Sequence, residues 1–229
     1  MLNKEITDVF FDLDHTLWDF DKNSGLAFDR VFKKHKIKLP VTDFLKEYEP
    51  INLLYWKKYR EERVTKQELR RGRLTEAFAV FKIEYSIEII DLLAVSYIDE
   101  LPVDNYLFEN TLETLDYLYG KYKLHIITNG FEEVQHLKLN NSGIKNYFKT
   151  VTTSEEVGLK KPHPSVFQTA MTKAAALPQK SIMIGDSFEA DIVGAQNSGM
   201  HTLFFNNRNE VVNKIYPSIK ELSEIKDYL

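Results

Sequence analysis

The chain has 229 residues, of which 43% are hydrophobic and none is cysteine, and its formal net charge is −4. Without cysteine it cannot form disulfides, use a thiolate as nucleophile or bind zinc through sulfur. A slightly acidic globular composition does not favour binding to nucleic acid or to acidic membrane surfaces. Because no apolar run is long enough for a signal peptide or a membrane span, the sequence predicts a cytoplasmic protein.

Five short apolar runs predict the buried strands of one sheet. They cover residues 7–13, 124–128, 148–152, 181–185 and 201–205. Helical patterns separate the later runs, at residues 112–119, 131–140, 164–175 and 190–197. Strands that alternate with helices in this way predict an α/β fold, a doubly wound parallel sheet with helices on both faces.

Residues 17–97 interrupt this alternation. They contain no strand pattern, only helical patterns at residues 24–35, 43–60, 66–81 and 87–97. Thr65 and Glu68 have the spacing of a capping box at the start of the third helix. We therefore predict two domains, a core formed by residues 1–16 and 98–229 and an inserted helical domain formed by residues 17–97.

Side chains suited to catalysis or ligand binding stand at or just after the ends of several predicted core strands. They are Asp12 and Asp14 after the first strand, Thr128, Asn129 and Gly130 at the end of the second, Lys161 after the third, and Asp186 and Asp191 after the fourth. Because the carboxyl ends of parallel strands share one edge of the sheet, we expect these side chains to lie close together.

These residue types in this arrangement point to phosphoryl transfer. A phosphate monoester needs its charge neutralised and a nucleophile in line with the leaving oxygen, and a carboxylate can be that nucleophile. Asp12 and Asp186 can hold Mg²⁺, which prefers oxygen ligands. Asp14 is then expected to protonate the leaving alcohol and later to activate water. Lys161 adds a positive charge that keeps the nucleophile ionised.

The segment after the second strand has two interpretations. The Thr128 hydroxyl and the N–H groups of Asn129 and Gly130, at the start of a helix, are suited to bind phosphate. Asn and Gly are also common in ordinary turns. The position of the segment at the strand end favours phosphate binding. Lys160 and Lys161 are adjacent, and a lysine pair in a loop is usually solvated; of the two, Lys161 directly precedes Pro162.

Together these motifs resemble those of the haloacid dehalogenase (HAD) superfamily. That family has, in order, Asp-x-Asp-x-Thr, a strand ending in Ser or Thr, a Lys commonly followed by Pro, and Gly-Asp-x-x-x-x-Asp. The matching residues are Asp12, Asp14 and Thr16, then Thr128, then Lys161 and Pro162, then Gly185, Asp186 and Asp191. The resemblance implies a Rossmann-like core with Asp12 as nucleophile and Asp14 as acid and base. It also implies Mg²⁺ held by Asp12, the Asp14 carbonyl and Asp186, with Asp191 outside this ligand shell.

The inserted domain resembles the C1-type helical cap of this superfamily, because it lies between the first two motifs. Residues 127–131, 154–158 and 56–73 look like those of bacterial nucleotidases that hydrolyse pyrimidine and non-canonical nucleoside monophosphates. The resemblance therefore implies a nucleoside 5′-monophosphate as substrate. The basic segment 56–73 is by default the solvated face of two cap helices. Its other interpretation is that the cap places an arginine or aromatic side chain over the nucleotide, with Arg73 and Phe20 as candidates. The alternatives are a sugar phosphatase or a phosphomutase. A dehalogenase is disfavoured because dehalogenases lack the second Asp, here Asp14. A non-catalytic binding module is disfavoured by the complete set of acids.

Overall fold

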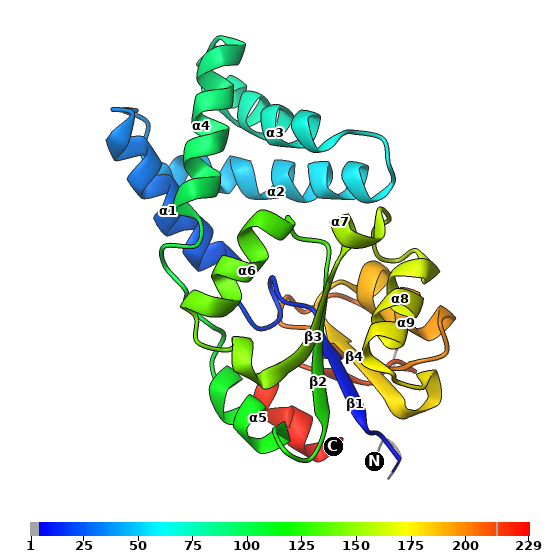
Figure 1. Ribbon diagram of the computed structural model, residues 1–229. Helices are drawn as coiled ribbons and strands as arrows, with labels where there is room; N and C mark the ends of the chain where they lie inside the picture. Colours follow the sequence, from blue (N-terminus) through cyan, green and yellow to red (C-terminus); the bar gives the residue numbers. More distant parts are fainter. Residues whose placement is uncertain (1–4, 214) are drawn as a thin grey trace. The chain divides into compact units, whose positions relative to one another are not determined.

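The computed structural model describes residues 5–213 and 215–229, and the chain divides into two compact units (Figure 1). One unit, which we call the core, comprises Met1–Phe20 and Asn105–Leu229. The other, which we call the helical unit, comprises Asp21–Asp104. These bounds differ by a few residues from those expected for an insertion at residues 17–97, and its role as a cap stays a prediction.

Backbone pairing explains why residues 17–20 belong to the core. Trp18 forms an antiparallel bridge with Leu107, and the Phe108 N–H donates to the Leu17 carbonyl at 3.0 Å. The chain that leaves the core is thus hydrogen-bonded to the chain that returns to it. The Trp18 side chain is fully buried beside this pairing.

Six parallel strands form the sheet of the core, in the order β3-β2-β1-β4-β5-β6. Their bounds are β1 Asp8–Phe11, β2 Lys123–Thr128, β3 Phe148–Thr153, β4 Ser181–Gly185, β5 His201–Phe205 and β6 Ser218–Ile219. The five predicted strands are confirmed, whereas β6 is too short to show an apolar run. Because Phe11 is in register with both Ile126 and Ile184, β1, β2 and β4 end at the same edge.

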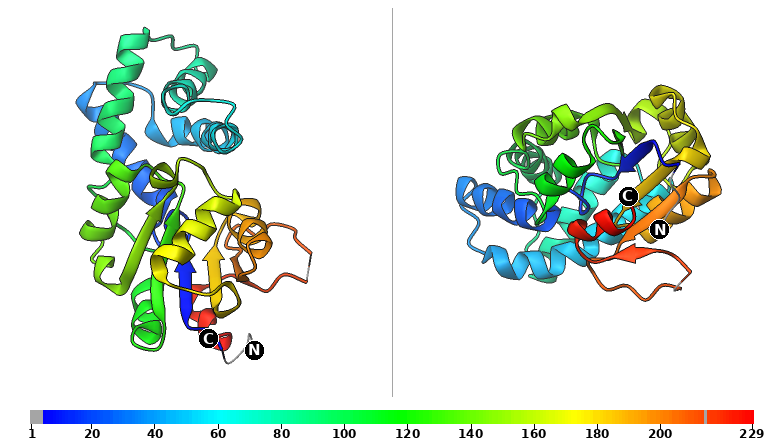
Figure 2. Two further views of the ribbon diagram at one scale, coloured as in Figure 1. Left: turned by 45° about the vertical axis from the view of Figure 1, so that its right-hand side comes forward. Right: turned by 90° about the horizontal axis from the view of Figure 1, so that it is seen from below.

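Helices cover both faces of this sheet, as the doubly wound fold predicts (Figures 1 and 2). The α-helices of the core are α5 Thr111–Leu118, α6 Glu132–Asn141, α7 Ser154–Val157, α8 Pro164–Ala174 and α9 Gly194–Asn197. Short turns of 3₁₀ or π type are η1 Lys145–Tyr147, η2 Pro178–Lys180, η3 Phe188–Val193 and η4 Leu222–Asp227. On one face, Phe10 and Met183 of the sheet pack with Phe167 of α8 and Ala195 of α9. Helices α5 and α6 lie on the other side (Figure 1).

The helical unit is built from α1 Phe20–Lys34, α2 Val41–Arg60, α3 Lys66–Val80 and α4 Ile87–Glu100. Its interior is rich in aromatic side chains, with the ring of Phe28 centred 5.0 Å from that of Phe44 and 4.6 Å from that of Tyr48. The predicted capping box is confirmed: the Glu68 N–H donates to the Thr65 hydroxyl at 3.2 Å, and the Thr65 N–H donates to the Glu68 carboxylate at 2.7 Å.

Among the described residues, no helix is both long enough and apolar enough to cross a membrane.

Candidate active site

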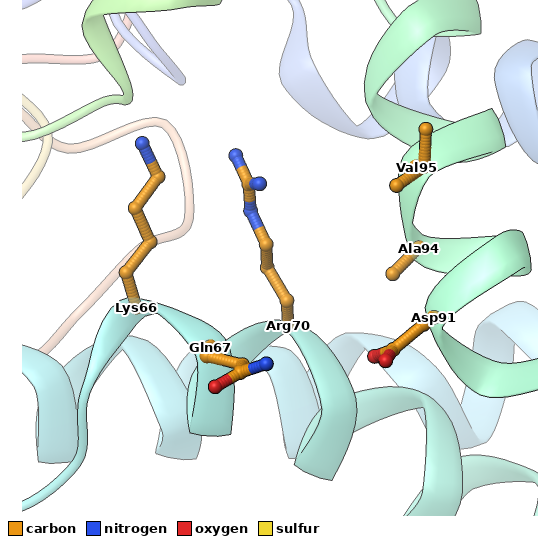
Figure 3. A pocket seen from close by; sticks show the side chains of 6 residues that line it. All are labelled: Lys66, Gln67, Arg70, Asp91, Ala94 and Val95. Carbon is orange, nitrogen blue, oxygen red and sulfur yellow. The ribbon is translucent and has the colours of Figure 1, made fainter. Parts of the chain in front are cut away.

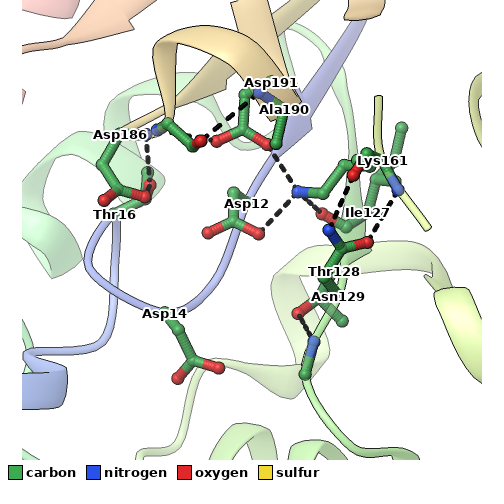
Figure 4. A network of polar contacts seen from close by, with 12 residues as sticks. Asp12, Asp14, Thr16, Ile127, Thr128, Asn129, Lys161, Asp186, Ala190 and Asp191 are labelled. Atoms are coloured by element: carbon green, nitrogen blue, oxygen red, sulfur yellow. Dashed lines mark hydrogen bonds and ion pairs between the residues drawn. The ribbon is translucent and has the colours of Figure 1, made fainter. Parts of the chain in front are cut away.

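The predicted residues meet at the carboxyl edge of the sheet (Figure 4). Asp12 directly follows β1, and its N–H donates to the Ile184 carbonyl of β4 at 2.9 Å. Thr128 is the last residue of β2, and Asp186 directly follows β4. Lys161 reaches the same place from the loop between α7 and α8. The parallel register therefore gathers groups that are more than a hundred positions apart in the chain.

Lys161 is the centre of this cluster. Its side chain is buried, and its ammonium group donates to Asp12 Oδ1 at 2.7 Å, to Asp191 Oδ1 at 2.6 Å and to the Ile127 carbonyl at 2.7 Å. All three N–H donors are therefore satisfied. Burial alone would lower the pKa of Lys161, but the two carboxylates outweigh it and raise the pKa above its usual value. Lys161 thus makes an ion pair with Asp12.

Asn129 holds Lys161 in place. Its side-chain amide donates to the Lys161 carbonyl at 3.0 Å, and its side-chain oxygen accepts from the Lys161 N–H at 2.8 Å. This pair of bonds ties the strand end of β2 to the loop that carries the lysine. The side chain of Asn129 is therefore occupied with positioning Lys161, and a role of Asn129 in binding substrate stays a prediction.

Three carboxylates lie close together beside Lys161. One oxygen from each of Asp12, Asp186 and Asp191 lies within 4.8 Å of the others. Burial raises the pKa of Asp12 to about 7, and Asp191 adds to the rise while Lys161 opposes it. Burial and the charges of Asp12 and Asp191 also raise the pKa of Asp186 well above its usual range. Like charges this close raise one another's pKa, and a bound cation would offset their repulsion.

The donor set fits a hard divalent cation. Both oxygens of Asp191 already accept hydrogen bonds, one from Lys161 at 2.6 Å and the other from the Ser187 N–H at 3.0 Å. Asp12 has one oxygen bound to Lys161 and a second one outside that bond. Asp12 and Asp186 are therefore the carboxylates suited to bind Mg²⁺ by oxygen, with Asp191 oriented by its neighbours.

Thr16 joins the first and last motifs. Its buried hydroxyl accepts the Asp186 N–H at 3.0 Å, so the segment after β1 is tied to the segment after β4. Asp191 lies in η3, a π-helical turn, which begins two residues before the helix expected at residues 190–197. Asp186 is half-buried, and the bond from its N–H to Thr16 helps to hold it beside Asp12.

Thr128 presents its hydroxyl in a defined orientation. The oxygen accepts the Gly130 N–H at 3.0 Å and the Gln135 side-chain amide at 2.7 Å. With both lone pairs used, the hydroxyl hydrogen is left to donate. A Cβ at Gly130 would lie 1.8 Å from the Gln135 amide nitrogen, so a larger residue there would have to displace the Gln135 side chain.

Asp14 contacts two residues that the sequence did not single out. Its Oδ1 accepts from Lys138 at 2.6 Å, and its Oδ2 accepts from Gln135 at 2.9 Å. Both partners lie on α6 and are buried. Burial lowers the pKa of Lys138 despite the charge of Asp14. Their spacing in the sequence could have pointed to them. They share the buried face of α6 with Val134 and Leu139, and polar residues are unusual on such a face.

A pocket of about 440 Å³ lies within the helical unit (Figure 3). It is lined by Lys66, Gln67, Arg70, Asp91, Ala94 and Val95. Arg73 is not among these residues: it is buried, donates to the Asn52 side chain at 2.9 Å and lies over the ring of Tyr97. Contact of Arg73 or Phe20 with a substrate stays a prediction.

The sequence matches a family model over most of its length. The model describes the haloacid dehalogenase-like hydrolases and matches residues 9–205. The chain belongs to this family of enzymes.

Three relatives illustrate the range of this HAD family. Pyrimidine 5′-nucleotidase YjjG of Escherichia coli is 31% identical over 86% of this chain and 85% of its own length. Pyrimidine 5′-nucleotidase PynA of Streptococcus pneumoniae is 32% identical over 86% of this chain and 83% of its own. Glyceraldehyde 3-phosphate phosphatase of Methanothermobacter thermautotrophicus is 41% identical, but only over 43% of this chain and 44% of its own.

Solved structures agree with the fold. The HAD-hydrolase YfnB of Bacillus subtilis, described as bound to magnesium, superposes with a TM-score of 0.89 at 27% identity over 98% of both chains. The L-2-haloacid dehalogenase of Xanthobacter autotrophicus superposes with a TM-score of 0.71 at 16% identity over 97% of both chains. At 16% identity, the similarity to the dehalogenase shows a shared fold alone.

Proposed function

We propose that this HAD hydrolase is a Mg²⁺-dependent phosphatase that hydrolyses nucleoside 5′-monophosphates through a phospho-aspartate on Asp12. One observation carries the proposal: a buried lysine bonds to Asp12 beside two further carboxylates, at the edge of the sheet where Asp14 and Thr128 also lie. Carboxylates grouped in this way suit a divalent cation and, with it, a phosphate.

In the first step Asp12 attacks phosphorus, and the bond from phosphorus to the alcohol oxygen breaks. The Asp14 carboxyl group gives its proton to that oxygen, so the alcohol leaves neutral. Lys161, at 2.7 Å from Asp12, keeps the nucleophile ionised. The Thr128 hydroxyl donates to a phosphate oxygen. Mg²⁺, when held by Asp12, Asp186 and the Asp14 carbonyl, would neutralise charge on the phosphoryl group.

In the second step water displaces Asp12 from phosphorus. The Asp14 carboxylate takes a proton from that water as it attacks, which restores the carboxyl group for the next cycle. Inorganic phosphate leaves and the Asp12 carboxylate is regenerated. The same two aspartates therefore serve both steps, and atoms and protons balance over the cycle.

The substrate class is supported by the relatives and not by a contact in the structure. Two relatives that cover most of the chain are pyrimidine 5′-nucleotidases. The second candidate is a sugar phosphate, supported by the likeness of part of the chain to glyceraldehyde 3-phosphate phosphatase.

A substrate screen tests the proposal. Phosphate release is measured from pyrimidine and purine nucleoside monophosphates, sugar phosphates and p-nitrophenyl phosphate, with Mg²⁺ and with a chelator. We expect release that requires Mg²⁺ and is fastest with a nucleoside 5′-monophosphate. Isomer formation in place of phosphate release would indicate a mutase. Halide release from a 2-haloacid that survives the chelator would contradict the proposal.

A further inference from the structure

Helix α6 holds Asp14, the proposed acid and base, through two hydrogen bonds. Asp14 accepts one bond at each carboxylate oxygen, from Lys138 at 2.6 Å and from Gln135 at 2.9 Å. The two donors are three residues apart on α6, so they lie on the same face of the helix. Together they fix both the position of Asp14 and the rotation of its carboxylate plane.

The surroundings of Lys138 strengthen this bond. Its ammonium nitrogen lies 4.2 Å from the ring centre of the buried Trp18. The Lys138 side chain is only 3% exposed, whereas the Asp14 side chain is 18% exposed. The lysine is therefore shielded from water, and opposite charges attract more strongly there than in water. The carboxylate is the more exposed member of the pair and the one that a substrate can reach.

Gln135 connects this pair to the phosphate-binding hydroxyl. The same amide nitrogen that donates to Asp14 also donates to the Thr128 oxygen at 2.7 Å. A single side chain thus sets the distance between the group that handles the proton and the group that is expected to bind phosphate. Gly130 leaves the space that Gln135 occupies.

Stability alone does not account for this arrangement. A buried ion pair costs desolvation energy, and apolar residues of the same size often replace such a pair without loss of stability. Resting on the proposed function above, we propose that Lys138 and Gln135 are positioning residues for the reaction: they hold Asp14 where it can protonate the leaving oxygen and activate water, whereas Lys161 holds the nucleophile Asp12.

The two steps of the reaction provide the test. p-Nitrophenolate leaves without a proton, so its release reports attack by Asp12 alone, whereas turnover also needs Asp14 to activate water. In Lys138→Met we expect a rapid release of one p-nitrophenolate per enzyme at close to the wild-type rate. Steady turnover should then fall about 100-fold, because general acid and base catalysis contributes at least that much. Asp14→Asn should give the same pattern.

Controls separate this role from a loss of folding. Lys173→Met breaks a surface ion pair with Glu156 on the same domain and should leave both phases unchanged. Gln135→Leu, which keeps the charge of Lys138, should reduce steady turnover by about tenfold. If Lys138→Met does not fold, by circular dichroism and thermal unfolding, Gln135→Leu decides the question.

The result can overturn the inference in two ways. Turnover of a nucleotide within threefold of wild type in the folded variants would show that Asp14 does not need these residues. Loss of the rapid phase in Lys138→Met would show that the lysine acts on phosphoryl transfer to Asp12 instead. Absence of Mg²⁺-dependent turnover in the wild type would refute the proposed function, and the inference with it, so the two failures are distinguishable.

Discussion

The first strand carries a buried aspartate at each end, and the two ends are built differently. Asp8 at the amino end is 3% exposed, and Asp12 at the carboxyl end is 7% exposed. Asp8 accepts from the Thr7 hydroxyl at 2.6 Å and is bonded to the His125 ring at 3.2 Å. Asp12 is bonded to Lys161, but shares it with Asp191 and lies beside Asp186.

The two ends of β1 differ in the balance of charges around the aspartate and not in how deeply the aspartate is buried. At the amino end, burial lowers the pKa of His125 although Asp8 opposes this, and the other ring nitrogen pairs with the Thr150 hydroxyl at 2.9 Å. Each polar group there has a partner, so the cluster needs no ligand. At the carboxyl end, Asp12 and Asp191 share the Lys161 ammonium group, and a third carboxylate, that of Asp186, lies beside them. A surplus of like charge is costly in a fold, and it is typical of functional sites.

Asp12→Asn should give the largest effect, and it should be on activity. Asparagine keeps the shape of the side chain but cannot form the phosphoryl ester, so we expect turnover to fall at least about a thousandfold. Removal of one of three crowded charges should leave the free energy of unfolding without Mg²⁺ at or above that of wild type. Enzyme assays and urea unfolding measure the two quantities. A variant that retains activity would refute the mechanism.

Asp8→Ala should lower the stability of the protein and leave its activity nearly unchanged. The buried His125 N–H would lose its acceptor, which costs about 1–3 kcal/mol in the free energy of unfolding. Turnover at a temperature where the variant is folded should stay within about threefold of wild type, because Asp8 lies at the other end of β1 from the site. The same unfolding and activity assays apply. If this variant lost activity but not stability, the contrast between the two ends would be wrong.

The sequence was informative where chain topology alone sets the position of a residue. Asp12 and Asp186 follow strand ends, and Thr128 is the last residue of a strand. Because parallel strands bring such ends together, these positions can be predicted without knowing how the side chains pack. Lys161 could be selected over Lys160 only through the resemblance to the HAD motifs. The short strand β6 offered no pattern, since it has only two residues.

Residues that act through their packing were not predictable in the same way. Gln135 and Lys138 share a helix face with Val134 and Leu139, but what they contact depends on how α6 docks against the sheet. Asn129 was predicted from its place in a motif, yet its side chain holds the Lys161 backbone. Asp8 and His125 were not singled out, because their pairing across β1 and β2 depends on strand register.

The most direct test is to trap the phosphoryl group on the enzyme. Wild type and Asp12→Asn are mixed with Mg²⁺ and a substrate that the wild type hydrolyses, quenched in acid within one turnover, digested and analysed by mass spectrometry. We predict that the wild-type peptide containing Asp12 gains the mass of one phosphoryl group on that residue, and that the variant gains none. A phosphoryl group on another residue, or turnover by the variant at the wild-type rate, would contradict the account.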